Sequence, residues 1–213
     1  MGNKKIASMS VIRRLPKYHR YLRELLTSEG DIISSKKLSE GLGFTATQIR
    51  QDLNCFGYFG EHGLGYNVKE LLNEISEILG LFKEYKMIII GAGNFGQAIA
   101  NHIKFRLYFK LIGIFDHNPK LIGLEILDIE VININELVNF LKVTPADIGI
   151  ICVSENNAQT VADIMVQNGI KGIWNFTPAD LELPEEIVLE NVHLSESLLT
   201  LSCLMNGKLN SNL

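Results

Sequence analysis

The first sixty residues consist of short amphipathic stretches separated by turns. Apolar side chains recur at helical spacing in residues 16–26, which predicts a helix that Gly30 ends. A second helix is predicted over residues 34–40, before the Gly-Leu-Gly at 41–43, and a third from the capping box at 45–48 to about residue 55. Two helices joined by a tight glycine-containing turn predict a helix-turn-helix.

A glycine- and aromatic-rich segment follows the third helix. Residues 56–66 hold four glycines and four aromatic residues, a pattern that favours a β-hairpin of the kind that forms the wing of a winged helix. Residues 68–82 are then apolar at helical spacing with acidic residues between, and we expect this helix to connect two domains.

From residue 86 the hydrophobic period changes. Apolar runs predict the strands of a buried parallel sheet, and amphipathic stretches between them predict helices. The predicted strands are 87–91, 111–116, 148–153 and 169–174, and the predicted helices are 94–105, 135–141 and 157–168. Alternation of this kind predicts a doubly wound α/β domain of the Rossmann type. One more amphipathic helix is predicted over 195–205.

These patterns divide the chain into three parts. We expect a winged-helix domain with its connecting helix at 1–84, a Rossmann domain at 85–194 and a C-terminal helix at 195–213. The fold class is therefore α/β, with an N-terminal winged helix in front of the Rossmann domain.

Composition and charge narrow the choice of partners. The chain has 46% hydrophobic residues, and no apolar run approaches the roughly 18–20 residues of a membrane span. Three isolated cysteines indicate a cytoplasmic protein without disulfides or a metal site. The net charge is −4, yet residues 1–60 carry ten Lys and Arg against five Asp and Glu, which favours nucleic acid as a partner of this part.

The strongest motif is a glycine-rich loop between a strand and a helix. Residues 91–96 match G-x-G-x-x-G, and a second strand ends in Asp116, twenty residues after Gly96. Backbone amides at the helix start would hold a pyrophosphate, and Asp116 would accept hydrogen bonds from the adenosine ribose and repel a 2′-phosphate. NAD(H) is therefore the expected ligand, and another nucleotide such as CoA is the alternative. The predicted cofactor-binding residues are Gly91, Ala92, Gly93, Asn94, Phe95, Gly96, Asp116 and His117.

The third helix supplies the candidate base-reading residues. Arg50 and Gln48 match guanine and adenine by bidentate pairing, and nearby lysines and arginines, among them Arg13, Arg14 and Lys17, could contact phosphates. The predicted DNA-contacting residues are Lys36, Lys37, Thr47, Gln48, Arg50, Gln51, Asn54 and His62. The alternative is a helical dimerisation domain whose basic face is merely solvated.

No arrangement of residues indicates catalysis. A dehydrogenase needs a proton donor or acceptor beside the nicotinamide. His117 belongs at the adenosine end, His193 ends a predicted strand, and Cys152 has no neighbouring base. We therefore expect a protein that binds a dinucleotide without turning it over.

Together these motifs resemble the Rex family of redox-sensing transcriptional repressors over about residues 8–205. The resemblance rests on RRLPKYHRYL, ISSKKLSEGLG, QIRQDLNCFGYFGEHGLGY, GAGNFGQAI, FDHNPKLIG and GIKGIWNFTP, in that order. It implies a repressor that binds operator DNA as a homodimer and is released when NADH binds the Rossmann domains. It also implies that the C-terminal helix is exchanged between subunits, near the partner's nicotinamide.

Several positions depart from the family pattern. Gln51 stands where the family has Lys, and Glu61-His62 where the wing usually carries Arg or Lys, which predicts weaker DNA binding. His102 and His193 stand where the family has a Tyr and an Asp. The resemblance implies that these two positions, together with Arg20, form a switch that links redox state to DNA binding. Because imidazoles titrate near neutrality, the coupling is expected to depend on pH. The alternatives are a NAD-dependent oxidoreductase and an NADH-sensing paralogue that has lost DNA recognition.

Overall fold

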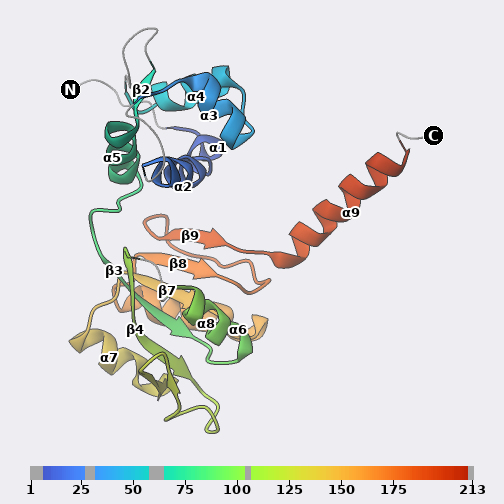
Figure 1. Cartoon of the computed structure of the whole chain (residues 1–213). Helices are drawn as coiled ribbons and strands as arrows, with labels where there is room; N and C mark the ends of the chain where they lie inside the picture. Colours follow the sequence, from blue (N-terminus) through green and yellow to red (C-terminus); the bar gives the residue numbers. More distant parts are fainter. Residues whose placement is uncertain (1–6, 27–31, 58–64, 104–106, 211–213) are drawn as a thin grey trace. The chain divides into compact units, whose positions relative to one another are not determined.

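The computed structural model describes residues 7–26, 32–57, 65–103 and 107–210 (Figure 1). The chain forms two compact units, Met1–Lys83 and Glu84–Leu213. The predicted wing residues Glu61 and His62 lie outside the described residues.

The first unit is a helical domain with a small antiparallel sheet. Its elements are α1 (Met9–Ile12), α2 (Leu15–Leu25), β1 (Ile32–Ile33), α3 (Ser35–Leu42), α4 (Ala46–Asn54), β2 (Tyr66–Asn67) and α5 (Val68–Ile78). Buried apolar side chains from all the longer helices form one core, with Leu22 and Ile49 completely enclosed. The core therefore joins α2, α3, α4 and α5 into one structure.

The helix-turn-helix pair α3–α4 begins and ends at the residue types that the sequence analysis identified. Ser34 caps α3 by accepting a hydrogen bond from the Lys37 amide at 3.2 Å, and Thr45 caps α4 through the Gln48 amide at 3.2 Å. Helix α3 continues past Gly41, where the Tyr21 ring occupies the space that a Cβ would need. It ends at Gly43 in the left-handed conformation, two residues later than expected.

The second unit is built on a seven-stranded sheet. The strands are β3 (Tyr85–Ile90), β4 (Phe109–Asp116), β5 (Glu125–Ile126), β6 (Ile129–Asn133), β7 (Ile148–Ile151), β8 (Gly172–Asn175) and β9 (Val188–Asn191). Their order is β5-β6-β4-β3-β7-β8-β9, and all neighbours are parallel except the β5–β6 pair. The predicted Rossmann fold is confirmed, and β5 and β6 are additional strands that the sequence analysis did not identify.

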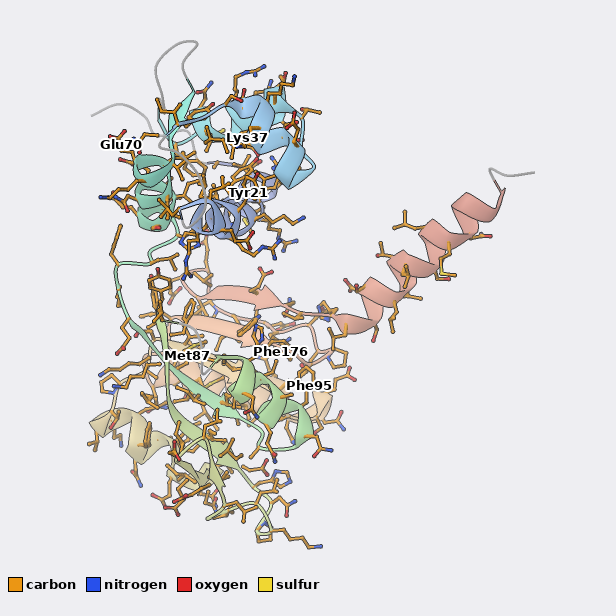
Figure 2. The ribbon with its side chains drawn as sticks, viewed as in Figure 1. Tyr21, Lys37, Glu70, Met87, Phe95 and Phe176 are labelled. Atoms are coloured by element: carbon orange, nitrogen blue, oxygen red, sulfur yellow. The ribbon has the colours of Figure 1, made fainter. Side chains whose placement is uncertain are left out.

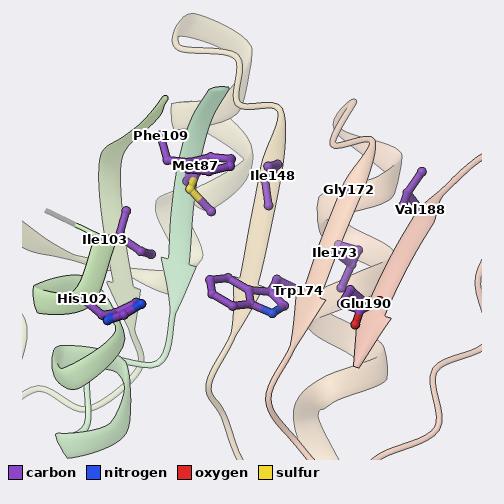
Figure 3. Close-up of a pocket in the computed structure, with 10 residues that line it drawn as sticks. All are labelled: Met87, His102, Ile103, Phe109, Ile148, Gly172, Ile173, Trp174, Val188 and Glu190. Carbon is purple, nitrogen blue, oxygen red and sulfur yellow. The ribbon is translucent and has the colours of Figure 1, made fainter. Parts of the chain in front are cut away.

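Helices cover the two faces of this sheet unequally. The helical segments are α6 (Asn94–Ile103), η1 (Ile134–Glu136), α7 (Leu137–Val143) and α8 (Glu155–Gln167). Ile88 and Ile90 of β3 join a core with α7 and α8, whereas Met87 and Ile89 join a core with α6 on the opposite face. On the α6 face, the part of the sheet formed by β7, β8 and β9 borders a groove (Figure 3).

The last helix, α9 (Leu194–Asn210), buries none of the side chains that the structure describes. Leu194, Leu198, Leu201 and Met205 recur at helical spacing along it, and each is more than half exposed. An apolar stripe of this kind normally packs against another surface.

Candidate functional site

The glycine-rich loop lies at the position where the strand order reverses. After β3 the chain adds strands on one side of the sheet, and it then returns to add β7 on the other side of β3. Gly91 follows β3 and Cys152 follows β7, so the crevice outside their carboxyl ends opens at the loop. Ligands of open α/β sheets bind at such a topological switch point.

Two of the loop glycines are required by backbone packing. Gly91 has φ +106°, and a Cβ there would lie 2.5 Å from the carbonyl oxygen of Cys152. A Cβ on Gly96 would collide with the carbonyl oxygen of Gly91, so α6 can approach the strand only with glycine at this position. Gly93 is exposed and has no atom within 4 Å of a built Cβ, which leaves its backbone open to a ligand.

Asp116 holds the loop from the end of the neighbouring strand. Its Oδ2 accepts a hydrogen bond from the Ala92 amide at 2.6 Å, and its Oδ1 accepts one from the Asn118 amide at 2.7 Å. The residue is 8% exposed, and the ring of His117 lies with Nδ1 3.5 Å from Oδ1. A carboxylate can accept about four hydrogen bonds, so acceptor sites remain for a ribose hydroxyl.

A cavity of about 510 Å³ adjoins the loop and this carboxylate. It lies toward α7 and α8, and Gly91, Asp116 and His117 line it together with Ile134, Asn135, Val138, Val153, Asn157, Thr160, Val161 and Ile164. Apolar side chains with a carboxylate at one end match an adenosine, whose base is flat and whose ribose carries two hydroxyls. Asn94 is exposed at the first position of α6.

On the other side of the loop lies an aromatic cluster. The rings of Phe95 and Phe176 meet edge to face with centroids 5.4 Å apart (Figure 2), and Trp174 lies 4.6 Å from Phe176. The Phe95 backbone is part of the loop, and Trp174 lines the groove on the α6 face. The cluster therefore connects the glycine-rich loop with this groove.

The thiol of Cys152 is unsuited to proton transfer. Burial raises its pKa to about 12, so it stays protonated at neutral pH. Within the described residues no three His, Cys, Asp or Glu side chains gather where they could hold a metal ion.

In the first unit, α4 presents one polar face outward. Thr47, Arg50, Gln51 and Asn54 are exposed and Gln48 is half-buried, whereas Ile49 and Leu53 are in the core. Lys36 and Lys37 are exposed on α3. Seven of the eight predicted DNA-contacting residues thus lie on these two helices, and the eighth, His62, is outside the described residues.

Arg50 is oriented by two hydroxyl groups. Its Nη1 donates to Ser35 Oγ at 3.0 Å, and its Nη2 donates to Thr47 Oγ1 at 3.1 Å. Because Ser35 begins α3 and Thr47 lies in the first turn of α4, the guanidinium spans the starts of both helices. Guanidinium groups of this kind can pair with a guanine or a phosphate.

Arg14, a predicted phosphate contact, is paired with a carboxylate of its own chain. Arg14 makes two hydrogen bonds to the carboxylate of Asp52 on α4, at 2.6 and 2.7 Å. Tyr18 donates a third to Asp52 Oδ2 at 2.6 Å. Burial and this bond raise the pKa of Tyr18, and the bond to Asp52 raises the pKa of Arg14. Asp52 was not singled out from the sequence, although its spacing from Ile49 and Leu53 places it on the buried face of α4.

The predicted switch residues lie on three separate elements. Arg20 is exposed on α2 of the first unit. His102 lies near the end of α6, and His193 is half-buried between β9 and α9. His102 lines a groove of about 470 Å³ on the sheet, in which Trp174 lies between His102 and the β8–β9 side (Figure 3).

The helices that the structure describes include none that combines the length and the apolar character needed to cross a membrane.

Two family models match the two parts of the chain. The model described as putative DNA-binding protein N-terminus matches residues 5–54, and the model described as CoA binding domain matches residues 82–179. The second match covers most of the Rossmann part of the chain.

Known proteins resemble the whole chain. It is 64% identical over 206 residues to the redox-sensing transcriptional repressor Rex of Clostridium acetobutylicum, covering 96% of each chain. It also resembles two crystal structures of RSP, which is described as a Rex-family repressor. RSP with β-NAD⁺ and operator DNA has a TM-score of 0.91 at 55% identity, covering 98% of this chain and 96% of that one. RSP with β-NADH has a TM-score of 0.87 at 54% identity, covering 98% of both.

Proposed function

The chain belongs to the Rex family of redox-sensing transcriptional repressors, and on that premise we propose that it is an NADH-responsive repressor. It binds operator DNA as a homodimer and leaves the DNA when NADH occupies its Rossmann domains. The observation that carries the proposal is the pairing of two sites in one chain. Asp116 holds a glycine-rich loop open to a dinucleotide, and the exposed face of α4 offers polar side chains to DNA.

The ligand is NAD(H). RSP, a relative from this family, is in complex with β-NAD⁺ in one structure and with β-NADH in another. In this chain the Asp116 carboxylate would lie where a 2′-phosphate of NADP(H) would come, and its negative charge disfavours that phosphate. The residues that bind the dinucleotide are those of the loop at 91–96 with Asp116 and His117.

A repressor of this type requires NADH to bind two conformations unequally. A ligand that bound the DNA-competent and DNA-incompetent dimers with the same affinity would not change their ratio. The aromatic cluster of Phe95, Phe176 and Trp174 supports such a difference, because it joins the loop that holds the pyrophosphate to the groove on the sheet.

The homodimer forms through α9. Helix α9 has four exposed apolar residues at helical spacing, and an apolar groove over β7, β8 and β9 is uncovered. In a dimer, α9 of each copy could pack into the groove of the other. We expect Leu198→Glu with Leu201→Glu to shift the protein from dimer to monomer in sedimentation analysis. Cys203→Glu, on the opposite face of α9, is the matched control and should remain dimeric.

Arg20, His102 and His193 form the switch within that dimer. His102 lies in the groove, where Glu190 is the other ionisable lining residue among those described. Protonation of an imidazole there would change the charge of the interface. Operator affinity with and without NADH, compared at pH 6 and pH 8, should show different coupling; equal coupling at both pH values would refute the histidine switch.

A DNA-shift assay tests the proposed function. Palindromic promoter fragments are titrated with the protein, and then with NADH or NAD⁺ at fixed salt. We expect one or more fragments to be bound specifically and to be released by NADH at lower concentration than by NAD⁺. Failure to bind any fragment would favour a paralogue that senses NADH but lacks DNA recognition, consistent with Gln51 on the exposed face of α4.

The same protein should not oxidise NADH. Loss of NADH absorbance at 340 nm with a panel of aldehydes and ketones would indicate an oxidoreductase instead. As a repressor, the protein would act in the cytoplasm, where both chromosomal DNA and the free NADH pool are found.

A further inference from the structure

Asp52 occupies a position of the helix-turn-helix that an apolar residue would normally fill. On α4 it lies three residues after Ile49 and directly before Leu53, and all three are buried against the rest of the unit. Asp52 is only 3% exposed. The opposite face of the same helix carries Thr47, Arg50 and Gln51, which are exposed. A carboxylate therefore lies directly behind the face proposed to read DNA.

Three directional hydrogen bonds surround this carboxylate. Arg14 binds both of its oxygens through Nε and Nη2, and the buried Tyr18 hydroxyl binds Oδ2 at 2.6 Å. A planar guanidinium that binds both carboxylate oxygens fixes the plane of the carboxylate as well as its distance. Since Arg14 precedes α2 and Tyr18 lies on it, the contact fixes α4 against the first turns of α2.

The same segment of α2 also holds the turn between α3 and α4. Phe44 lies in that turn, and the Tyr18 ring meets it edge to face with centroids 5.9 Å apart. The Lys17 ammonium lies 5.4 Å from the centre of the Phe44 ring, and the Arg14 guanidinium lies 5.9 Å from it. One short stretch of chain, residues 14–18, therefore contacts α4 at Asp52 and the turn before α4 at Phe44.

We propose that Arg14, Tyr18 and Asp52 are positioning residues that set the orientation of α4, and thereby the specificity of operator recognition. This inference rests on the proposed function, because it assigns a role to residues behind the DNA-reading face. Apolar packing alone can let a helix rotate or slide by small amounts, whereas a bidentate ion pair and a buried hydroxyl allow one geometry.

Stability alone does not require a charged pair at this place. Replacing a buried ion pair by apolar residues of similar volume is often neutral or stabilising. The pair is also neutral overall, so its removal leaves the net charge of the first unit and its attraction to phosphates unchanged. A variant without the pair should therefore keep its fold and its non-specific DNA binding, and lose only operator specificity.

The test compares the full chain with Arg14→Met/Asp52→Leu, and separately with Tyr18→Phe. Affinity is measured for a bound operator fragment and for a scrambled fragment of the same length, over a range of salt concentrations. We expect the double variant to stay folded and keep its affinity for the scrambled fragment. Its ratio of specific to non-specific affinity should fall roughly ten- to hundredfold, the value of one bidentate base contact. Tyr18→Phe should lower the ratio less.

The matched control is Lys69→Met/Glu70→Leu on the exposed face of α5, which likewise replaces one cation and one carboxylate by Met and Leu, away from α4. Its specificity ratio should equal that of the wild type. If the Arg14/Asp52 variant is folded and keeps the wild-type ratio, the pair is a structural contact only and the positioning role is refuted.

Amide hydrogen exchange without DNA provides an independent measurement. In the Arg14/Asp52 variant we expect residues 46–54 to exchange at least tenfold faster, with no change in α5. Unchanged exchange in α4 would refute the proposal. If the wild type bound no DNA fragment, the proposed function would fall, and the exchange rates alone would decide whether the pair positions α4.

Discussion

Replacing Asp116 by Asn tests whether this carboxylate holds the dinucleotide loop. Asp116 accepts hydrogen bonds from the Ala92 amide at 2.6 Å and from the Asn118 amide at 2.7 Å, one on each oxygen. Asparagine has a single acceptor oxygen, so its NH₂ group would face one of the two N–H donors. Ala92 is completely buried, and water therefore cannot replace the lost partner.

The size of the effect follows from these contacts. One unsatisfied buried N–H costs about 1–3 kcal/mol, and the change from a charged to a neutral acceptor weakens the remaining bond by about 1 kcal/mol. We therefore expect the second unit to lose about 2–4 kcal/mol of unfolding free energy. NADH affinity should fall about ten- to hundredfold, because the ribose loses a charged acceptor and the loop is no longer held. The preference for NADH over NADPH should decrease, since the negative charge is gone.

Both quantities can be followed with one fluorophore. Trp174 is the only tryptophan of the chain, so its emission in a urea titration reports the second unit alone. Energy transfer from Trp174 to bound NADH gives the affinity. Asp163→Asn is the matched control, because Asp163 is exposed on α8 and accepts a hydrogen bond from Gln159 that Asn can keep. An Asp116→Asn protein with wild-type stability and NADH affinity would refute the role of the carboxylate.

Three further predictions concern Gly96, His19 and Cys152. Gly96→Ala should abolish NADH binding and destabilise the second unit by at least ~2 kcal/mol, because its Cβ would collide with the Gly91 carbonyl; thermal melts and NADH titration measure both. Burial, aided by Arg23, lowers the pKa of His19, so the first unit should be fully stable above pH 6.5 and lose stability as the pH falls below it. Melting curves at pH 7.5 and 5.0 test this, and His19→Gln should show a smaller difference. Cys152 should resist alkylation at pH 8 until the protein is unfolded, because its pKa is about 12; rapid labelling of the native protein would contradict this.

The two alternatives to a repressor make different demands on the same chain. An oxidoreductase needs a group that exchanges a proton beside the nicotinamide. Cys152, the thiol next to the crevice, is held protonated by burial. A paralogue without DNA recognition would not need the exposed polar face of α4, where Arg50 is kept in place by Ser35 and Thr47. The placement of Arg50 favours the repressor over the paralogue, and the NADH-oxidation assay distinguishes it from an oxidoreductase.

The sequence by itself determined the elements and the nucleotide loop. The hydrophobic pattern distinguishes the strands of the sheet from the helices that cover it. A strand buried on both faces is a continuous apolar run, whereas a helix buried on one face has apolar residues at helical spacing. Ser34 and Thr45 cap helices as expected, because capping depends on residues three positions apart. The glycines at 91 and 96 could also be identified from the sequence, because both belong to one local turn and their spacing is fixed by it. The short β5 and β6 strands were not, because two to five residues carry too little periodicity.

Only the tertiary structure decided which side chains meet across the chain. Arg14 and Asp52 are thirty-eight positions apart, and Asp116 and the Ala92 amide are twenty-four apart. Asp52 looks like an ordinary charged residue in the sequence, and Asp116 was expected only to bind the ribose. Burial and a particular partner give each of them a role in holding the structure. The uncovered groove beside Trp174 and the exposed stripe of α9 likewise depend on which surfaces remain after the sheet has formed. Local pattern sets the elements, and long-range packing decides which charges are buried and which apolar faces remain exposed.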